Sequence, residues 1–366
     1  MPEARPTRAN APTTKDLILG ILGVMTKVFP GMLMGCVLLS VGCGGEGPSP
    51  LVDGGVLDMG DGGPPPTPSA RVDPTCRDGM YAEAPPDLSV SVADLAFSGD
   101  VAGFVDASLA RRYPFGGSLV ASGRMDTRFG GDCSVIFAGS PTSAADVFRS
   151  LDTIVHECGH FADGRLSTGP RNTYLIQSEL TYACERGDTT TRGGDTFARS
   201  RIRTDEYQAL RPPCDSPGQR GCDGYANIYL NGDPDDAMFE SGDQGFNLLL
   251  EETVQYVNSL VTAYAFSDQI RPGSSTSARD GILTFLWYVE RYLHLARSTY
   301  PDAYARISGD ACFRDAILTV WGRAWLFLER TRDLGALGIE DDVLETYVSD
   351  PVLLDEIERL RVLAGC

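Results

Sequence analysis

The sequence predicts an α+β fold that is mostly helical, with a small sheet in its N-terminal part and a helical C-terminal part. Apolar residues recur at helical spacing in several long segments, whereas the alternating runs typical of strands are few and short. With 42% hydrophobic and 22% charged residues, the chain has the composition of a globular protein. A formal charge of -19 argues against nucleic acid as a partner, because phosphate contacts need clustered cations.

The first 43 residues have the features of an export signal. Residues 25–27 give a short positive start, residues 28–41 are largely apolar, and small residues precede Cys43. This arrangement resembles a bacterial lipoprotein signal peptide. A second possible lipidation motif ends at Cys36. The resemblance implies a lipid anchor on Cys43 and a place in the cell envelope. Residues 1–24 are then either an extended start of the signal or lie before a true start at Met25.

Residues 44–75 are predicted to form a disordered tether. They are rich in Gly, Pro, Asp and Ser, and their few apolar side chains do not offset the entropy of ordering. The globular domain is therefore expected to span residues 76–366. We divide it into an α/β part at 76–184, a loop-rich insert at 185–245 and a helical part at 246–366.

The α/β part is expected to mix strands and helices. Residues 88–92 alternate like a strand, and residues 133–138 form a short β-rich run typical of a strand that leads into a helix. Helical spacing predicts a helix over residues 101–112 and a longer one over residues 143–164, which begins with a capping box at Ser143.

The longer helix carries the motif that points to chemistry, residues 156–160, which read His-Glu-Cys-Gly-His. Two histidines at i and i+4 project from one helix face, so both can bind a single tetrahedral ion at about 2.0–2.1 Å. Glu157 can then take a proton from a water that the ion activates and deliver it to a leaving amine. Since the chain has only three histidines, two of them in this motif predict a metal-dependent hydrolysis, with His156 and His160 as ligands.

The motif resembles that of the zincin metalloproteases, which carry His-Glu-x-x-His on an active-site helix behind a strand. Metzincins continue with Gly and His beyond the second histidine, where this chain has Asp163 and Leu166. The likeness is therefore to the gluzincins. It implies a zincin-like arrangement around the helix, Zn²⁺ as the cofactor, a glutamate as the third ligand, and a peptide or protein as the substrate.

Three glutamates compete for the place of the third ligand. Glu179 has a separation from the motif that gluzincins commonly use, but residues 174–184 alternate as a strand whose water-facing side would carry it. Glu251 and Glu252 lie on a helix predicted over residues 246–264. Glu251 shares a polar stripe of this helix. Glu252 lies among apolar neighbours, where a carboxylate needs a partner or a cation, and is the preferred ligand.

Other residues are assigned with respect to this site. Tyr256, one turn after Glu252, is expected to donate a hydrogen bond to the oxyanion of the reaction intermediate, unless it is simply core. Asp152 and Asp163 are placed to orient an imidazole or to be solvated on the helix surface. The third histidine, His294, has charged helical neighbours and is explained by a solvated face.

The cysteines predict disulfides. Of the ten cysteines, two fall in the signal, and the remaining eight form an even set outside the cytosol. Cys214 and Cys222 flank a Pro/Gly loop and suit a local bridge, and the spacing leaves the other three pairings open. Cys158 lies about 200° round the helix from His156, so it is expected to face away from the metal.

The sequence thus predicts an exported, lipid-anchored zinc metallopeptidase that acts as a monomer on peptides or proteins. Three alternatives stay open at this point. The chain could hydrolyse a bond other than a peptide, it could be a catalytically silent surface lipoprotein that retains the fold, or it could be a structural envelope protein. Metal content and turnover separate these possibilities.

Overall fold

The computed structural model describes residues 71–126, 130–168, 170–185 and 196–366. The described part is mostly helical and has one small antiparallel sheet of two strands, so the predicted α+β class is confirmed at this level. The signal, Cys43 and residues 44–70 of the tether lie outside the described residues. Residues 71–75, also assigned to the tether, pack on the domain, because the backbone oxygen of Arg71 accepts hydrogen bonds from Trp321 and Arg361.

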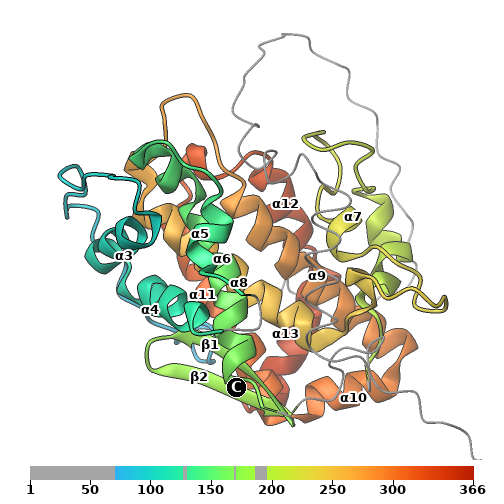
Figure 1. The fold of residues 1–366 in the computed structure, drawn as a ribbon. Helices are drawn as coiled ribbons and strands as arrows, with labels where there is room; N and C mark the ends of the chain where they lie inside the picture. Colours follow the sequence, from blue (N-terminus) through green and yellow to red (C-terminus); the bar gives the residue numbers. More distant parts are fainter. Residues whose placement is uncertain (1–70, 127–129, 169, 186–195) are drawn as a thin grey trace, which may run out of the picture.

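Helices α6 (Ala144–Leu166) and α8 (Phe246–Ala265) lie side by side near the middle of the molecule (Figure 1). Ser143 caps α6 by accepting a hydrogen bond from the backbone of Asp146, as the capping box predicts. A Cβ atom on Gly159 would lie 1.9 Å from Oε1 of Gln255, so the close approach of the two helices requires glycine there. This contact brings the motif helix and the predicted glutamate helix together.

Among the described residues, three helices precede α6: α3 (Val101–Arg112), α4 (Pro114–Arg124) and α5 (Cys133–Ala138). The helix α3 has the predicted bounds. The strand predicted over residues 133–138 is wrong, because this segment is the helix α5, which Asp132 caps through the backbone N–H of Ser134. A short apolar run does not distinguish a strand from a buried helix by its periodicity.

The strand predicted over residues 88–92 is also wrong, since the segment consists of turns and irregular chain. Asp87 accepts hydrogen bonds from the backbone N–H and the hydroxyl of Ser89, which stabilises a local turn in place of a ladder. Alternation alone therefore overstated the β content of this part.

The sheet is a hairpin of β1 (Arg171–Gln177) and β2 (Leu180–Glu185), in which Tyr174 pairs with Tyr182. The single strand predicted over residues 174–184 is thus two strands joined by a turn at residues 178–179. The hairpin lies against α6 and β2 also contacts α11, so it covers one end of the motif helix.

Five helices follow α8 in the C-terminal part. They are α9 (Ala278–Thr299), α10 (Pro301–Gly309), α11 (Ala311–Arg330), α12 (Asp341–Val348) and α13 (Pro351–Ala364). Large aromatic side chains such as Trp287 and Trp321 are buried there, which agrees with the predicted helical core. Five short 3₁₀ segments also occur in the described chain: η2 (Arg199–Thr204), η3 (Glu206–Ala209), η4 (Ser241–Asp243), η5 (Ser267–Gln269) and η6 (Gly335–Leu337).

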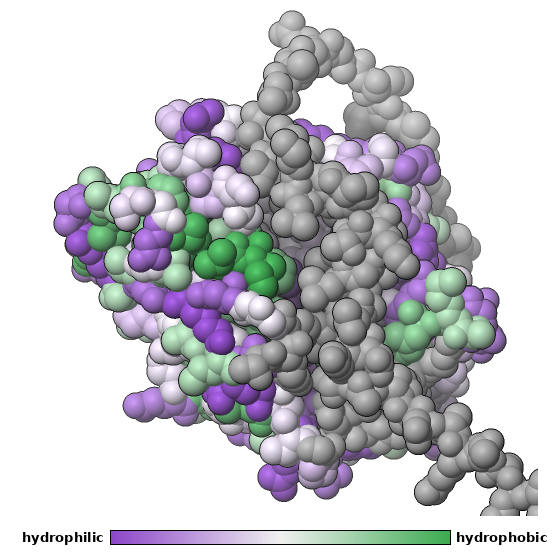
Figure 2. Space-filling model, in the orientation of Figure 1, coloured by the Kyte–Doolittle hydropathy of each residue, from purple (hydrophilic) through white to green (hydrophobic). Residues whose placement is uncertain are grey.

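The loop-rich insert contains η2 to η4 and one short helix, α7 (Ala226–Tyr229). In Figure 1, α7 lies on the side of the molecule opposite to α3 and α4. Figure 2 shows an apolar patch among polar residues on the side of α3 to α5. Met125, Val135 and Ile136, in or next to α4 and α5, are exposed apolar side chains.

Disulfides connect distant parts of the described chain. The bridges join Cys76 to Cys366, Cys133 to Cys158, Cys184 to Cys312 and Cys214 to Cys222. The bridge between Cys214 and Cys222 is the local one that the loop spacing predicts. Cys158 ties α6 to α5, away from the two histidines, as its place on the helix predicts. Within the described ranges, no helix is long and apolar enough to cross a membrane.

Candidate metal centre

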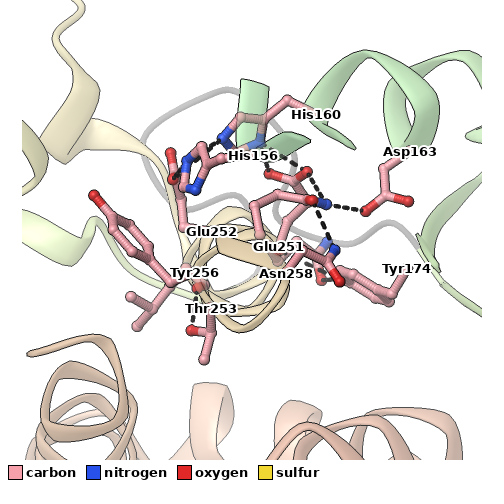
Figure 3. A network of polar contacts seen from close by, with 12 residues as sticks. His156, His160, Asp163, Tyr174, Glu251, Glu252, Thr253, Tyr256 and Asn258 are labelled. Carbon is pink, nitrogen blue, oxygen red and sulfur yellow. Dashed lines mark hydrogen bonds and ion pairs between the residues drawn. The ribbon is translucent and has the colours of Figure 1, made fainter. Parts of the chain in front are cut away.

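Donor atoms of His156, His160 and Glu252 come together between α6 and α8 (Figure 3). The two histidine Nε2 atoms lie 3.0 Å apart, and Oε2 of Glu252 lies 3.6 Å from the first and 3.4 Å from the second. Ligand atoms of a tetrahedral zinc ion stand about 3.3 Å apart, as bond lengths of about 2.0–2.1 Å require. In the described part of the chain, this is the one group of three metal-ligating side chains that meets in this way.

The carboxylate of Glu252 tests whether a cation fits this place. Its Oε2 atom is buried and has no hydrogen-bond partner in the described structure, although it faces both imidazoles. Burial favours the neutral acid, but the charge of His160 and contacts with both histidines outweigh burial and hold the pKa of Glu252 well below its usual range. The carboxylate is buried, receives no hydrogen bond at Oε2 and faces two ring nitrogens. Together these three groups form a set of ligand atoms that suits a divalent cation.

A second carboxylate stands behind His160. Its Nδ1 atom lies 2.9 Å and 2.7 Å from the two carboxylate oxygens of Glu251. Since a carboxylate accepts hydrogen bonds, Nδ1 donates its proton to Glu251, and a metal would bind at Nε2 in place of the second proton that a charged ring holds there. Burial disfavours a charged ring, but the charges of Glu251 and Glu252 outweigh it and raise the pKa of His160 well above its ordinary value. Glu251, which the sequence offered as a possible third ligand, therefore contacts a candidate ligand, His160.

His156 is oriented by a hydroxyl. The Oγ atom of Ser259 donates to the backbone oxygen of Asp152 at 3.2 Å and lies 3.5 Å from Nδ1 of His156. With its own proton directed to Asp152, the hydroxyl oxygen accepts from Nδ1, which again leaves Nε2 free of a proton. The side chain of Asp152 instead accepts from the backbone of Thr153, so the predicted contact of this residue with the site runs through its main chain.

Glu157 follows His156 directly on α6 and is half-buried. Burial raises its pKa, the charges of both histidines oppose this, and the charges of Glu252 and Glu251 add to it. These four neighbours place the carboxyl group of Glu157 within the electrostatic reach of the whole site. A raised pKa suits a carboxylate that accepts a proton and later returns it.

Tyr256 lies beside the site, with its ring 4.6 Å from the ring of His156. Its hydroxyl is 2.9 Å from the hydroxyl of Tyr229 on α7, a residue that the sequence patterns did not single out. Burial raises the pKa of both tyrosines well above the ordinary value, so both are neutral phenols. One hydroxyl of such a pair donates to the other, and the second proton can serve another acceptor.

The remaining candidates lie elsewhere. Glu179 is exposed in the hairpin turn, and Nδ1 of His294 pairs with Glu356 at 3.1 Å. Asp163 is buried and not solvated: it accepts from the backbone N–H of Leu175 and from the amide of Gln255, each at 2.9 Å. The sequence patterns assigned no role to Gln255, which the structure places between Asp163 and Glu251.

The chain was compared with protein-family models, with curated proteins and with solved structures, and none of them matched. The functional interpretation therefore depends on the residues of this chain and on their geometry.

Proposed function

We propose that this chain is a zinc-dependent hydrolase, a gluzincin-like metallopeptidase that cleaves peptide bonds. The observation that carries the proposal is the meeting of two Nε2 atoms and one buried carboxylate oxygen at 3.0 to 3.6 Å, next to a glutamate on the same helix as the histidines. When both rings are neutral, with their protons on Nδ1, the two Nε2 atoms and the oxygen are all acceptors. Without a cation, or a proton shared between them, these atoms repel one another.

In this proposal, each residue has a defined task. His156, His160 and Glu252 hold the ion, which when bound supplies a Lewis acid and lowers the pKa of a water to about 7. Glu157 accepts the proton of the attacking water and passes it to the leaving amine. Tyr256, whose hydroxyl is hydrogen-bonded to that of Tyr229, donates to the oxyanion that forms on the substrate.

The proposal extends to the place of action. The signal-like residues before Cys43 support export and a lipid anchor, which would hold the domain at the cell envelope through the tether. Disulfides at four cysteine pairs in the described structure fit an oxidising compartment. The substrate would be a peptide or protein outside the cytosol, met by a monomeric enzyme.

The test is the zinc content of the purified full chain, measured by elemental analysis, together with its activity on a peptide library. We expect one zinc ion per chain in the parent and in Glu157→Gln, and none in His160→Ala or Glu252→Ala. Glu157→Gln should lose about 10²–10⁴-fold in turnover, because the base is gone while the ligands remain. Glu179→Gln serves as the control and should match the parent in both measurements.

Each other outcome has a meaning. A parent chain without zinc contradicts the proposal and favours a catalytically silent surface lipoprotein or a structural envelope protein. A parent that binds zinc through the same three residues but cleaves no peptide favours a hydrolase of another bond.

A further inference from the structure

We infer that Gln255 is a positioning residue for the metal site, with a hydrogen-bond direction set by the buried guanidinium of Arg323. The inference rests on the proposed metal site. It concerns how this chain prepares His160 to bind the ion, before any substrate arrives.

Gln255 connects two carboxylates, those of Asp163 on the motif helix α6 and of Glu251 on α8. It is fully buried on α8, and its Nε2 atom donates to Oδ2 of Asp163 at 2.9 Å and to Oε1 of Glu251 at 3.4 Å. Glu251 in turn accepts from Nδ1 of His160 at 2.7 Å. The amide of Gln255 therefore positions the carboxylate of Glu251, which in turn positions the imidazole of His160.

The direction of these hydrogen bonds follows from Arg323 on α11. Its Nη1 atom lies 2.6 Å from Oδ1 of Asn258, and a guanidinium only donates. The amide oxygen of Asn258 must therefore face Arg323, which turns its Nδ2 atom toward Oε1 of Gln255 at 3.0 Å. With its oxygen engaged by Asn258, Gln255 presents its NH₂ group to the two carboxylates.

The far end of this series is also anchored. Arg323 is almost fully buried and pairs with Glu83 at 2.7 Å, and the hydroxyl of Tyr113 also donates to Oδ1 of Asn258 at 3.3 Å. A continuous series of contacts thus runs from Glu83 through the core to the metal ligand. Because arginine does not lose its proton, the orientation of both amides is fixed at any ordinary pH.

The consequence for the metal is a single histidine tautomer. Glu251, held by the amide, accepts the Nδ1 proton of His160, so Nε2 points at the ion with its lone pair. The close packing at Gly159, where any side chain would collide with Gln255, lets the amide reach Asp163 on α6. If the amide were only filling the core, its loss would change stability but leave the preference of His160 for zinc unchanged.

The experiment compares zinc affinity of the full chain and its variants by competition with a chromophoric chelator. In Gln255→Met, which keeps the length but removes the hydrogen bonds, we expect a dissociation constant for zinc about 10–100-fold larger. Thr262→Val is the matched control, because Thr262 is buried on the same stripe of α8 and its hydroxyl donates to the backbone of Asn258. The control should bind zinc as the parent does.

A second measurement reports on the tautomer. The chain has three histidines, so labelling them with ¹⁵N gives few signals to assign. The Nδ1 proton of His160 should exchange slowly with water in the zinc-loaded parent and faster in Gln255→Met. Gln255→Asn, which keeps an amide one methylene too short, gives the same comparison if Gln255→Met does not fold.

Folded variants with the zinc affinity and proton exchange of the parent would overturn the inference and leave the proposed function in place. A parent that binds no zinc would overturn the proposed function itself. The two failures are therefore distinguished within one set of samples.

Discussion

Around α9, Arg291 is fully buried and forms a two-pronged ion pair with Asp205, at 2.8 Å and 2.9 Å. Between α6 and α8, the buried Oε2 atom of Glu252 meets two imidazoles and has no hydrogen-bond partner in the described structure. The first region contains a buried charge together with its counter-charge, although Nη1 of Arg291 has no hydrogen-bond partner in the described structure. The second contains a charge whose remaining partner would be an ion. The comparison separates a charge that is paired within the fold from a charge that, in the proposed function, an ion held with two imidazoles would pair.

Breaking the completed pair should have the largest effect on stability. Asp205→Ala leaves Arg291 buried without its carboxylate, and we expect the free energy of unfolding to fall by about 3–5 kcal/mol. Urea unfolding measures this. Asp235→Ala is the control, because Asp235 pairs with Arg201 at 2.9 Å on the surface, where a pair is worth about 0–1 kcal/mol. Equal losses in the two variants would contradict the distinction between the regions.

Completing the open set should have the next largest effect. Zinc at about 100 times its dissociation constant should raise the free energy of unfolding by about 2.7 kcal/mol, because it binds the folded chain alone. Thermal denaturation with zinc and with a chelator measures the difference. Glu252→Gln should lose most of this gain, while Asp205→Ala, if folded, should keep it. A zinc effect that survives in Glu252→Gln would place the ion elsewhere.

Much of the helical framework follows from sequence periodicity, and the exceptions have physical causes. The helix predicted over residues 246–264 is α8 with one residue added, because its pattern is long and has no breaker. The segment at residues 133–138 is too short for periodicity to decide, and in the structure Asp132 caps it as a helix. The turn at residues 178–179 was missed because β1 and β2 keep the same alternation on both sides of it.

The candidate site divides in the same way. The local motif indicated His156 and His160, and the apolar neighbours of Glu252 indicated the third member of the group. Tyr229 and Gln255 were not assigned roles, because their parts depend on how α7 and α6 pack against α8. Spacing along one helix carries no information about contacts between helices, so the polar stripe of α8 was visible while its partners were not.

Glu290 on α9 is a buried carboxyl group that, like Glu252, has no hydrogen-bond partner in the described structure, yet it does not lie at a metal site. Its substitution should have the smallest effect on stability. It is fully buried, and neither carboxylate oxygen has a hydrogen-bond partner among the residues described. Burial raises its pKa well above the ordinary value, and the charges of Asp350 and Glu356 add to the rise. With acidic neighbours in place of imidazoles, this carboxyl group keeps a proton where Glu252 would take a cation.

The sign of the pH dependence follows from this raised pKa. In the unfolded chain a glutamate ionises near pH 4.3, whereas in the folded chain Glu290 stays protonated to higher pH. The contribution of Glu290 to the free energy of unfolding is therefore greatest below about pH 4.3 and falls as the pH rises toward the pKa of Glu290 in the folded chain. Glu290→Gln does not titrate, so relative to the parent it should gain on the order of 1 kcal/mol at pH 8 and much less at pH 4. Urea unfolding across this range, with and without zinc, measures both effects. A gain that does not depend on pH would show that Glu290 is not a proton-holding group, and a changed zinc effect would show that the two regions are not independent.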